Sequence, residues 1–149
     1  MKAFVTATED SKAAPGDLFL ALLDLESLPA RVGEVERLTI ERAEELEGNR
    51  LKRVVIWEVR LRGALLRWTE SSVAHRDRLL VEFHQVEGDL SSFDGRWWIE
   101  PRPTGCRATL EAEVDIGVPL LAPMLNPVAV HSLQTNFCSM VADLSGTPT

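Results

Sequence analysis

Apolar and polar side chains alternate most regularly between residues 78 and 118. Three runs in this stretch keep period-two spacing, which predicts three consecutive antiparallel strands with one buried and one solvent-facing side. Such a sheet needs a covering element, and the long helix predicted from Asn126 to Leu144 is the candidate. We expect the sheet to wrap around this helix, with these residues on its inner face: Val81, Phe83, Gln85, Phe93, Gly95, Trp97, Ile99, Ala108, Leu110, Ala112, Val114 and Ile116.

The first 75 residues predict a strand, two short helices and three further strands. Alternation over residues 2–8 indicates the first strand. Helical spacing follows, with Pro15 and Asp17 near its start, where a missing N–H is tolerated and a negative charge is favoured. A second short helix is predicted over residues 24–32 and a strand over residues 34–43. With the later elements, this order predicts one α+β domain spanning the whole chain of 149 residues.

Two neighbouring runs, residues 50–61 and 64–75, predict a hairpin that folds back at Arg62 and Gly63. We expect Trp57 to lie opposite Trp68, with both side chains on the inner face of the sheet. This register places three further pairs opposite each other: Val59 and Leu66, Val55 and Glu70, and Arg53 and Ser72.

Glu70 is the most informative residue of this hairpin, because the register puts its carboxylate on the same face as the tryptophans. An isolated carboxylate is costly to bury, so it must be paired or must shift its pKa. Arg53 lies on the same face and is the expected partner. The next hairpin brings Gln85 beside Glu70. The alternative to a cavity residue that titrates during chemistry is a wet, salt-bridged glutamate at the sheet rim.

Charge and cysteine content narrow the class of protein. A net charge of −7 and a pI near 5.0 argue against a nucleic-acid partner or an anionic membrane surface, because both need a basic face. Cys106 and Cys138 form no disulfide framework, which favours a reducing cytoplasm. The chain shows neither a signal segment nor an apolar run of transmembrane length. We therefore expect a soluble cytoplasmic protein without stable membrane insertion, and the oligomeric state stays open.

The residues that commonly bind metals are scattered. The three histidines, His75, His84 and His131, share no metal-ligand spacing, and neither cysteine has a C-x-x-C partner. The glycines form no phosphate-binding loop. We predict no metal site and no cofactor.

Four segments of the chain read SKAAPGDLFLALLDLESLPARV, WTESS, GDLSSFDGRWWIEPRPTGCRATLEAEVDI and PLLAPMLNP. The first resembles the opening helices of helix-grip proteins of the START and birch-pollen-allergen type. The other three are similar to the polyketide cyclase/dehydrase and coenzyme Q-binding branch of that superfamily. The resemblance implies a seven-stranded curved antiparallel sheet wrapped around the C-terminal helix, with two short helices after the first strand. It also implies an apolar cavity that takes a hydrophobic ligand.

The chain departs from the best-understood members of that family. Aromatase/cyclases of aromatic polyketide pathways carry two inward arginines and a tyrosine that act on a poly-β-ketone. Ser72, Gln85 and Val35 occupy those positions here, and Leu28 stands where the family has a tryptophan. The departure favours a reduced or partly cyclised polyketide as substrate.

Two classes of function are compatible with these observations. The first is a polyketide cyclase or dehydratase whose hydrophobic substrate is presented by an acyl carrier protein, with Glu70 and Arg53 as catalytic residues. The second is a non-catalytic binding protein for a quinone, lipid or other apolar metabolite. Simple core filling is the plainer explanation of the aromatic residues. The predicted substrate-binding residues are Trp57, Trp68, Ser72, Phe83, Gln85, Phe93, Trp97, Asn136, Phe137 and Met140.

Overall fold

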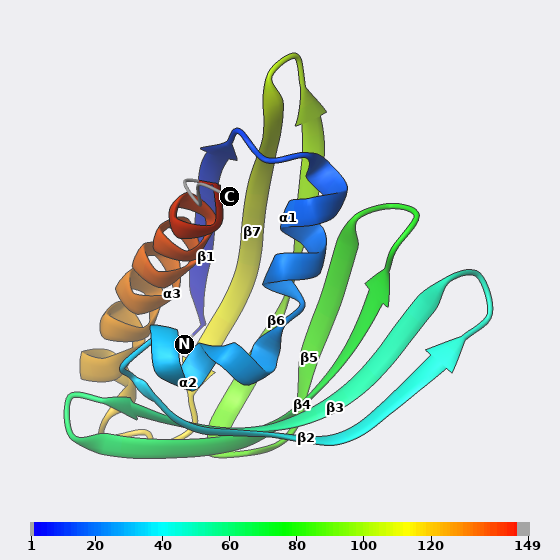
Figure 1. Ribbon diagram of the computed structural model, residues 1–149. Coiled ribbons are helices and arrows are strands. Elements are labelled where there is room, and N and C mark those ends of the chain that lie inside the picture. Colours follow the sequence, from blue (N-terminus) through cyan, green and yellow to red (C-terminus); the bar gives the residue numbers. More distant parts are fainter. Residues whose placement is uncertain (1, 146–149) are drawn as a thin grey trace.

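Seven antiparallel strands form one curved sheet in the order β1-β7-β6-β5-β4-β3-β2 (Figure 1). The computed structural model describes residues 2–145. The strands are β1 (Ala3–Ser11), β2 (Val35–Leu46), β3 (Arg50–Leu61), β4 (Ala64–His75), β5 (Leu80–Gly88), β6 (Leu90–Arg102) and β7 (Gly105–Ile116). Except for the pairing of β1 with β7, neighbours in the sheet are consecutive in the chain, as the alternation pattern predicted.

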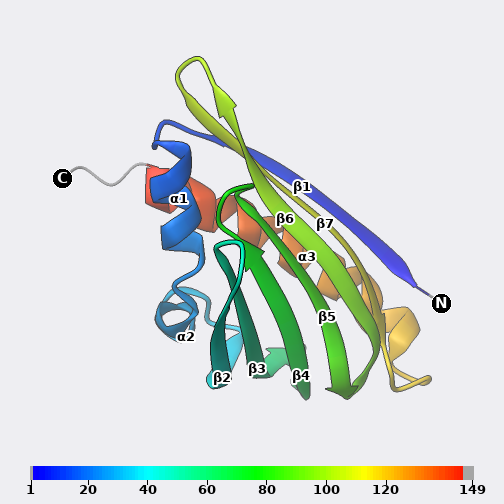
Figure 2. The same cartoon turned by 90° about the vertical axis from the view of Figure 1, so that its right-hand side faces the viewer.

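The helices lie on the concave side of this sheet. α1 (Pro15–Leu22), the 3₁₀ turn η1 (Leu25–Ser27) and α2 (Leu28–Arg31) follow β1, and α3 (Ala122–Ser145) follows β7. Figure 2 shows α3 running along the sheet, with α1 close to its C-terminal end. The predicted α+β helix-grip architecture is therefore confirmed, including the two short helical segments after the first strand.

The register of β3 and β4 also agrees with the prediction. Trp57 lies opposite Trp68, and Arg53 lies opposite Ser72. Across the next strand pair, Glu70 lies opposite Gln85. Period-two alternation and the tight turn at residues 62–63 were sufficient to define this register, because a slip of one residue would turn every tryptophan to the outer face.

The predicted start of the long helix was wrong by four residues. α3 begins at Ala122, so Pro123 lies in its first turn, where a missing N–H costs nothing. Asn126 does not mark the start of the helix. Its side chain is buried and bonds to β7. Its side-chain oxygen accepts a hydrogen bond from the backbone N–H of Ile116 at 2.8 Å, and its amide nitrogen donates to Asp115 at 3.0 Å.

Two strands are also longer than the alternation indicated. β1 continues to Ser11, which pairs with Cys106 of β7, and β2 continues to Leu46, which pairs with Arg50. Hydrogen bonding to a neighbouring strand extends both elements through residues whose side chains give no apolar signal.

α1 and Gly95 shape the inner face near the site. Phe19 of α1 is 1% exposed and lies 5.3 Å, between ring centroids, from Trp97 of β6, which anchors the helix to the sheet. A Cβ atom on Gly95 would meet the ring of Phe83 at 2.8 Å and Ala112 at 2.7 Å. The missing side chain therefore leaves room for the ring of Phe83 beside β6.

Candidate ligand-binding cavity

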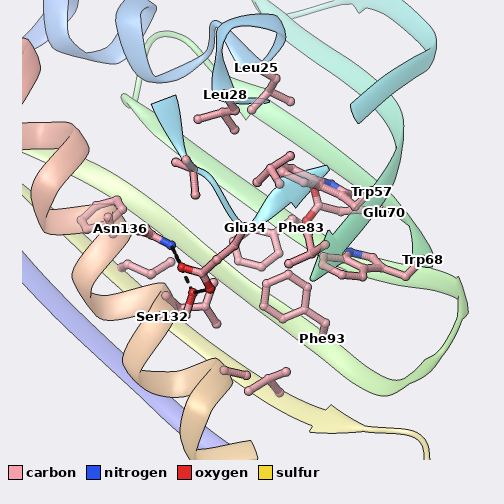
Figure 3. Close-up of a pocket in the computed structure, with 18 of the residues that line it drawn as sticks. Leu25, Leu28, Glu34, Trp57, Trp68, Glu70, Phe83, Phe93, Ser132 and Asn136 are labelled. Atoms are coloured by element: carbon pink, nitrogen blue, oxygen red, sulfur yellow. Dashed lines mark hydrogen bonds between the residues drawn. The ribbon is translucent and has the colours of Figure 1, made fainter. Parts of the chain in front are cut away.

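A cavity of about 240 Å³ lies between the concave face of the sheet, α3 and the short helices. Strands β3 to β7 supply one wall because their inward residues converge as the sheet curves. α3 supplies the facing wall, and Leu25 and Leu28 contribute from the short helices (Figure 3). Eleven of the twelve residues predicted for the site line this cavity: Arg53, Trp57, Trp68, Glu70, Ser72, Phe83, Phe93, Trp97, Asn136, Phe137 and Met140.

Aromatic rings form a continuous surface on the sheet side of the cavity. Trp57 and Trp68 stack with ring centroids 6.1 Å apart and an interplanar angle of 12°. Phe93 meets Trp68 edge to face at 5.8 Å and contacts Phe83 at 5.1 Å. Offset stacking and edge-to-face contacts are the favoured geometries of aromatic pairs, so these rings support one another. They present flat apolar surface to anything inside.

Glu70 lies within this aromatic surface and is 7% exposed. Burial raises its pKa from 4.5 to about 7, and a hydrogen bond from Trp57 and the positive charge of Arg53 oppose the rise. The indole nitrogen of Trp57 donates that bond to the Glu70 carboxylate at 3.4 Å. Glu70 is therefore a buried carboxyl group whose acid and base forms coexist near neutral pH.

Arg53 does not form the predicted salt bridge with Glu70. No nitrogen of its guanidinium lies within 4.0 Å of that carboxylate; instead, one terminal nitrogen donates to the carbonyl oxygen of Leu23 at 2.8 Å. The Leu23 carbonyl, at the C-terminal end of α1, accepts one hydrogen bond from the N–H of Leu25 at 2.9 Å and has a second lone pair that binds the cation, which explains the difference. Arg53 still acts on Glu70 through its charge, and its Nε atom is buried without a hydrogen-bond partner.

Gln85 is the predicted site residue that does not line the cavity. Its amide nitrogen donates to the carbonyl oxygen of Leu90 at 2.7 Å, and its amide oxygen accepts from the N–H of Leu90 at 3.1 Å. The pairing of β5 with β6 ends at His84 and Asp94, which leaves the backbone N–H and carbonyl of Leu90 without strand partners on the β5 side. The side chain of Gln85 satisfies them, so it holds the β5–β6 turn.

Glu34 and Ser132 line the cavity and were missed by the sequence reasoning. Glu34 stands between α2 and β2, and its carboxylate accepts hydrogen bonds from the hydroxyl of Ser132 and, at 3.2 Å, from the amide of Asn136 (Figure 3). The same Asn136 amide donates to Ser132 at 3.1 Å. The spacing of Ser132 and Asn136 on one helical face was a usable signal, but nothing local links them to Glu34.

Within residues 2–145, no three His, Cys, Asp or Glu side chains are placed to hold a metal ion together. In the same part of the chain, no helix has the length and apolar character needed to cross a membrane.

Solved structures share this fold over nearly the whole chain. The TTHA0849 protein of Thermus thermophilus matches with a TM-score of 0.79 and 24% identity, covering 96% of this chain and 94% of that one. The Zhui aromatase/cyclase of a Streptomyces species matches with a TM-score of 0.78 and 16% identity, covering 95% and 92%. A START superfamily protein of Mycobacterium smegmatis matches with a TM-score of 0.71 and 17% identity, covering 93% and 96%.

A search of curated proteins finds no match. The family described as "Polyketide cyclase / dehydrase and lipid transport" matches residues 11–141, which include α1, η1, α2, strands β2 to β7 and most of α3. The protein therefore belongs to the polyketide cyclase / dehydrase and lipid transport family.

Proposed function

We propose that the protein binds a hydrophobic, polyketide-like intermediate in this cavity and promotes its cyclisation or dehydration, with Glu70 as general acid and base. The observation that carries the proposal is the position of Glu70, a buried carboxyl group on an aromatic wall whose pKa is raised to about 7. Family membership supports the same class of ligand and reaction. Presentation by an acyl carrier protein and a cytoplasmic location stay predictions.

A carboxyl group with a pKa near neutrality suits both reactions. In an intramolecular aldol cyclisation, the carboxylate of Glu70 removes a proton from the carbon between two carbonyls. The resulting carbanion attacks a second carbonyl carbon, and that carbonyl oxygen takes up a proton. In a dehydration, the protonated acid donates its proton to the leaving hydroxyl group, which departs as water. The neighbouring carbon gives up a proton to the Glu70 carboxylate, and a C=C bond forms between the two carbons. A group with a pKa near the working pH performs either step efficiently.

Arg53 and the tryptophans have supporting roles in this proposal. The charge of Arg53 lowers the pKa of Glu70 toward neutrality against the effect of burial. The stacked rings of Trp57 and Trp68 offer a flat surface on which a flexible chain folds into a reactive conformation. Such positioning can supply a large part of a rate enhancement, because it removes the entropic cost of bringing reacting atoms together.

A non-catalytic carrier of a quinone, lipid or other apolar metabolite is the second candidate. Aliphatic and aromatic side chains make up most of the cavity lining, and the neutral Ser72 stands at a position where aromatase/cyclases carry an arginine. A carrier gains nothing from a titrating carboxyl group, however, because burying one costs stability.

Native mass spectrometry of freshly purified protein should identify an apolar molecule that co-purifies. Turnover should then be measured with reduced and partly cyclised polyketide thioesters. Glu70→Gln keeps the shape of the side chain and removes its titration, so turnover should fall by roughly 10²–10⁴-fold. Ligand affinity should change less than about tenfold if the aromatic wall supplies the positioning.

Glu87→Gln is the matched control because Glu87 is an exposed glutamate on the neighbouring strand β5. It should leave turnover unchanged. Equal turnover of Glu70→Gln and the unmodified protein would refute the catalytic role, and binding without turnover in either form would favour the carrier.

A further inference from the structure

We propose that Glu34, Ser132 and Asn136 form a second polar subsite in the cavity, which accepts a hydrogen bond from a hydroxyl group of the ligand. The ligand class that fits is a compact hydroxylated aryl ketone, with its carbonyl oxygen toward Glu70 and its hydroxyl toward Glu34. The inference rests on the proposed function in one respect, because it assigns the ligand of the same cavity. It concerns recognition and gives Glu34 no catalytic role.

Hydrogen-bond donors within the Glu34 subsite are already used. The Asn136 amide donates to both Glu34 and Ser132, and the Ser132 hydroxyl donates to Glu34. The capacity that is left consists of acceptors: further lone pairs of the Glu34 carboxylate, one on Ser132 and the amide oxygen of Asn136. No cation within residues 2–145 lies within ion-pair distance of Glu34. This end of the cavity therefore selects a ligand group that donates a hydrogen bond.

The opposite end of the cavity has the reverse character. Glu70 lies on this wall and is buried, and its carboxyl group donates a hydrogen bond when it is protonated. A ligand oxygen that accepts this hydrogen bond is therefore favoured.

Figure 3 shows the two polar groups on different walls. Glu34, Ser132 and Asn136 lie toward α3, whereas Glu70 lies with the tryptophans on β3 and β4. Side chains between them, including Phe83 and Phe93, are apolar. A ligand that satisfies both groups therefore carries an acceptor on one edge and a donor on another, with a flat apolar body between.

The size of the cavity sets a limit on that body. Its volume of about 240 Å³ is below the range of roughly 300–1,000 Å³ typical of sites for drug-sized ligands. A fused pair of rings suits this space better than a long extended chain.

The test compares two bicyclic ketones, 6-hydroxy-1-tetralone and 6-methoxy-1-tetralone. Both carry the same carbonyl and rings, and only the hydroxy compound has an O–H donor. Binding should be measured by isothermal titration calorimetry at about pH 6, because Glu70 is mostly protonated at that pH. The unmodified protein should bind the hydroxy compound at least about tenfold more tightly, as a hydrogen bond to a charged acceptor implies.

Glu34→Gln should reduce this preference to less than about threefold, because the carboxylate acceptor is replaced by an amide. Glu87→Gln should keep it. Equal affinity for the two ketones in the unmodified protein, or a preference that survives Glu34→Gln, would overturn the inference and leave the proposed function standing. Failure of both ketones to bind would also overturn it, and the turnover of Glu70→Gln decides the proposed function independently.

Discussion

Two glutamates line the same cavity, and their surroundings are opposite. Glu70 lies among aromatic rings, is 7% exposed and accepts one long hydrogen bond from Trp57. Glu34 lies at the junction of α2 and β2, is partly exposed and accepts two hydrogen bonds from side chains of α3. The carboxylate thus has few hydrogen-bond partners at the sheet wall and more of them at the α3 wall.

This difference separates reactivity from recognition. A carboxylate that lacks compensating hydrogen bonds gains from binding a proton, which is why the pKa of Glu70 rises to about 7. The Glu34 carboxylate has two donors already in place and offers its remaining lone pairs to a ligand.

The largest expected effect is a pH-dependent loss of stability caused by Glu70. Its pKa is raised in the folded protein from 4.5 to about 7, so between these values the folded state binds more protons than the unfolded state. Stability therefore falls as pH rises through this window, by about 3 kcal/mol in total, and is fully present below pH 4.5. Urea denaturation of the unmodified protein and of Glu70→Gln should show their unfolding free energies diverging across that window.

Glu34→Gln provides the comparison at the other wall. It keeps Glu70, so its unfolding free energy should still fall as pH rises through the same window. A Glu70→Gln curve that runs parallel to that of the unmodified protein would mean that Glu70 is solvated, and the assignment of the reactive wall would fail.

The next effect concerns Arg53, which combines a structural and an electrostatic contribution. Arg53→Met removes the hydrogen bond to the Leu23 carbonyl and should lower the unfolding free energy by about 1–3 kcal/mol, since a buried carbonyl loses a charged donor. It also removes the positive charge that lowers the pKa of Glu70. The pH window of the Glu70 effect should consequently extend upward.

Arg53→Lys keeps the charge and is the matched control. It should leave the upper edge of the pH window close to that of the unmodified protein, although the bond to Leu23 is weakened. An unchanged window in Arg53→Met would show that the charge does not reach Glu70.

The cavity wall formed by the sheet could be predicted because neighbouring strands are close in the sequence, so local patterns define how they pair. Alternation and a two-residue turn define the pairing of Trp57 with Trp68, and that register alone places Glu70 on the inner face. The two predictions that were wrong on this wall, for Arg53 and Gln85, depend on hydrogen bonds to backbone groups of other elements. Arg53 donates to a carbonyl 30 residues away in the chain, and Gln85 bonds to the backbone of Leu90 beyond the point where the β5–β6 pairing ends. Side-chain patterns carry no information about such carbonyls.

The helix wall was predicted less completely for the same reason. Phe137 and Met140 are on the apolar stripe of α3, and both line the cavity as expected. Glu34 joins Ser132 across 98 residues, and that contact arises only when the turn after α2 meets α3. Polar partners far apart in sequence leave no periodic signal, whereas apolar ones do.

The smallest expected effect is on the Glu34 subsite itself. Ser132→Ala removes one hydrogen bond from a carboxylate that is partly exposed, so water can replace the lost hydroxyl, and the unfolding free energy should fall by no more than about 1 kcal/mol. The Glu34→Gln change should cost a similar amount, because a glutamine can reorient its amide toward Ser132 and Asn136. The double variant, measured by urea denaturation, should cost less than the sum of the two single changes, since both remove the same contact. A cost above about 3 kcal/mol for either single change would mean that these three side chains mainly hold α3 against the sheet edge. Glu34 would then have a structural role, and only the wall that carries Glu70 would act on the ligand.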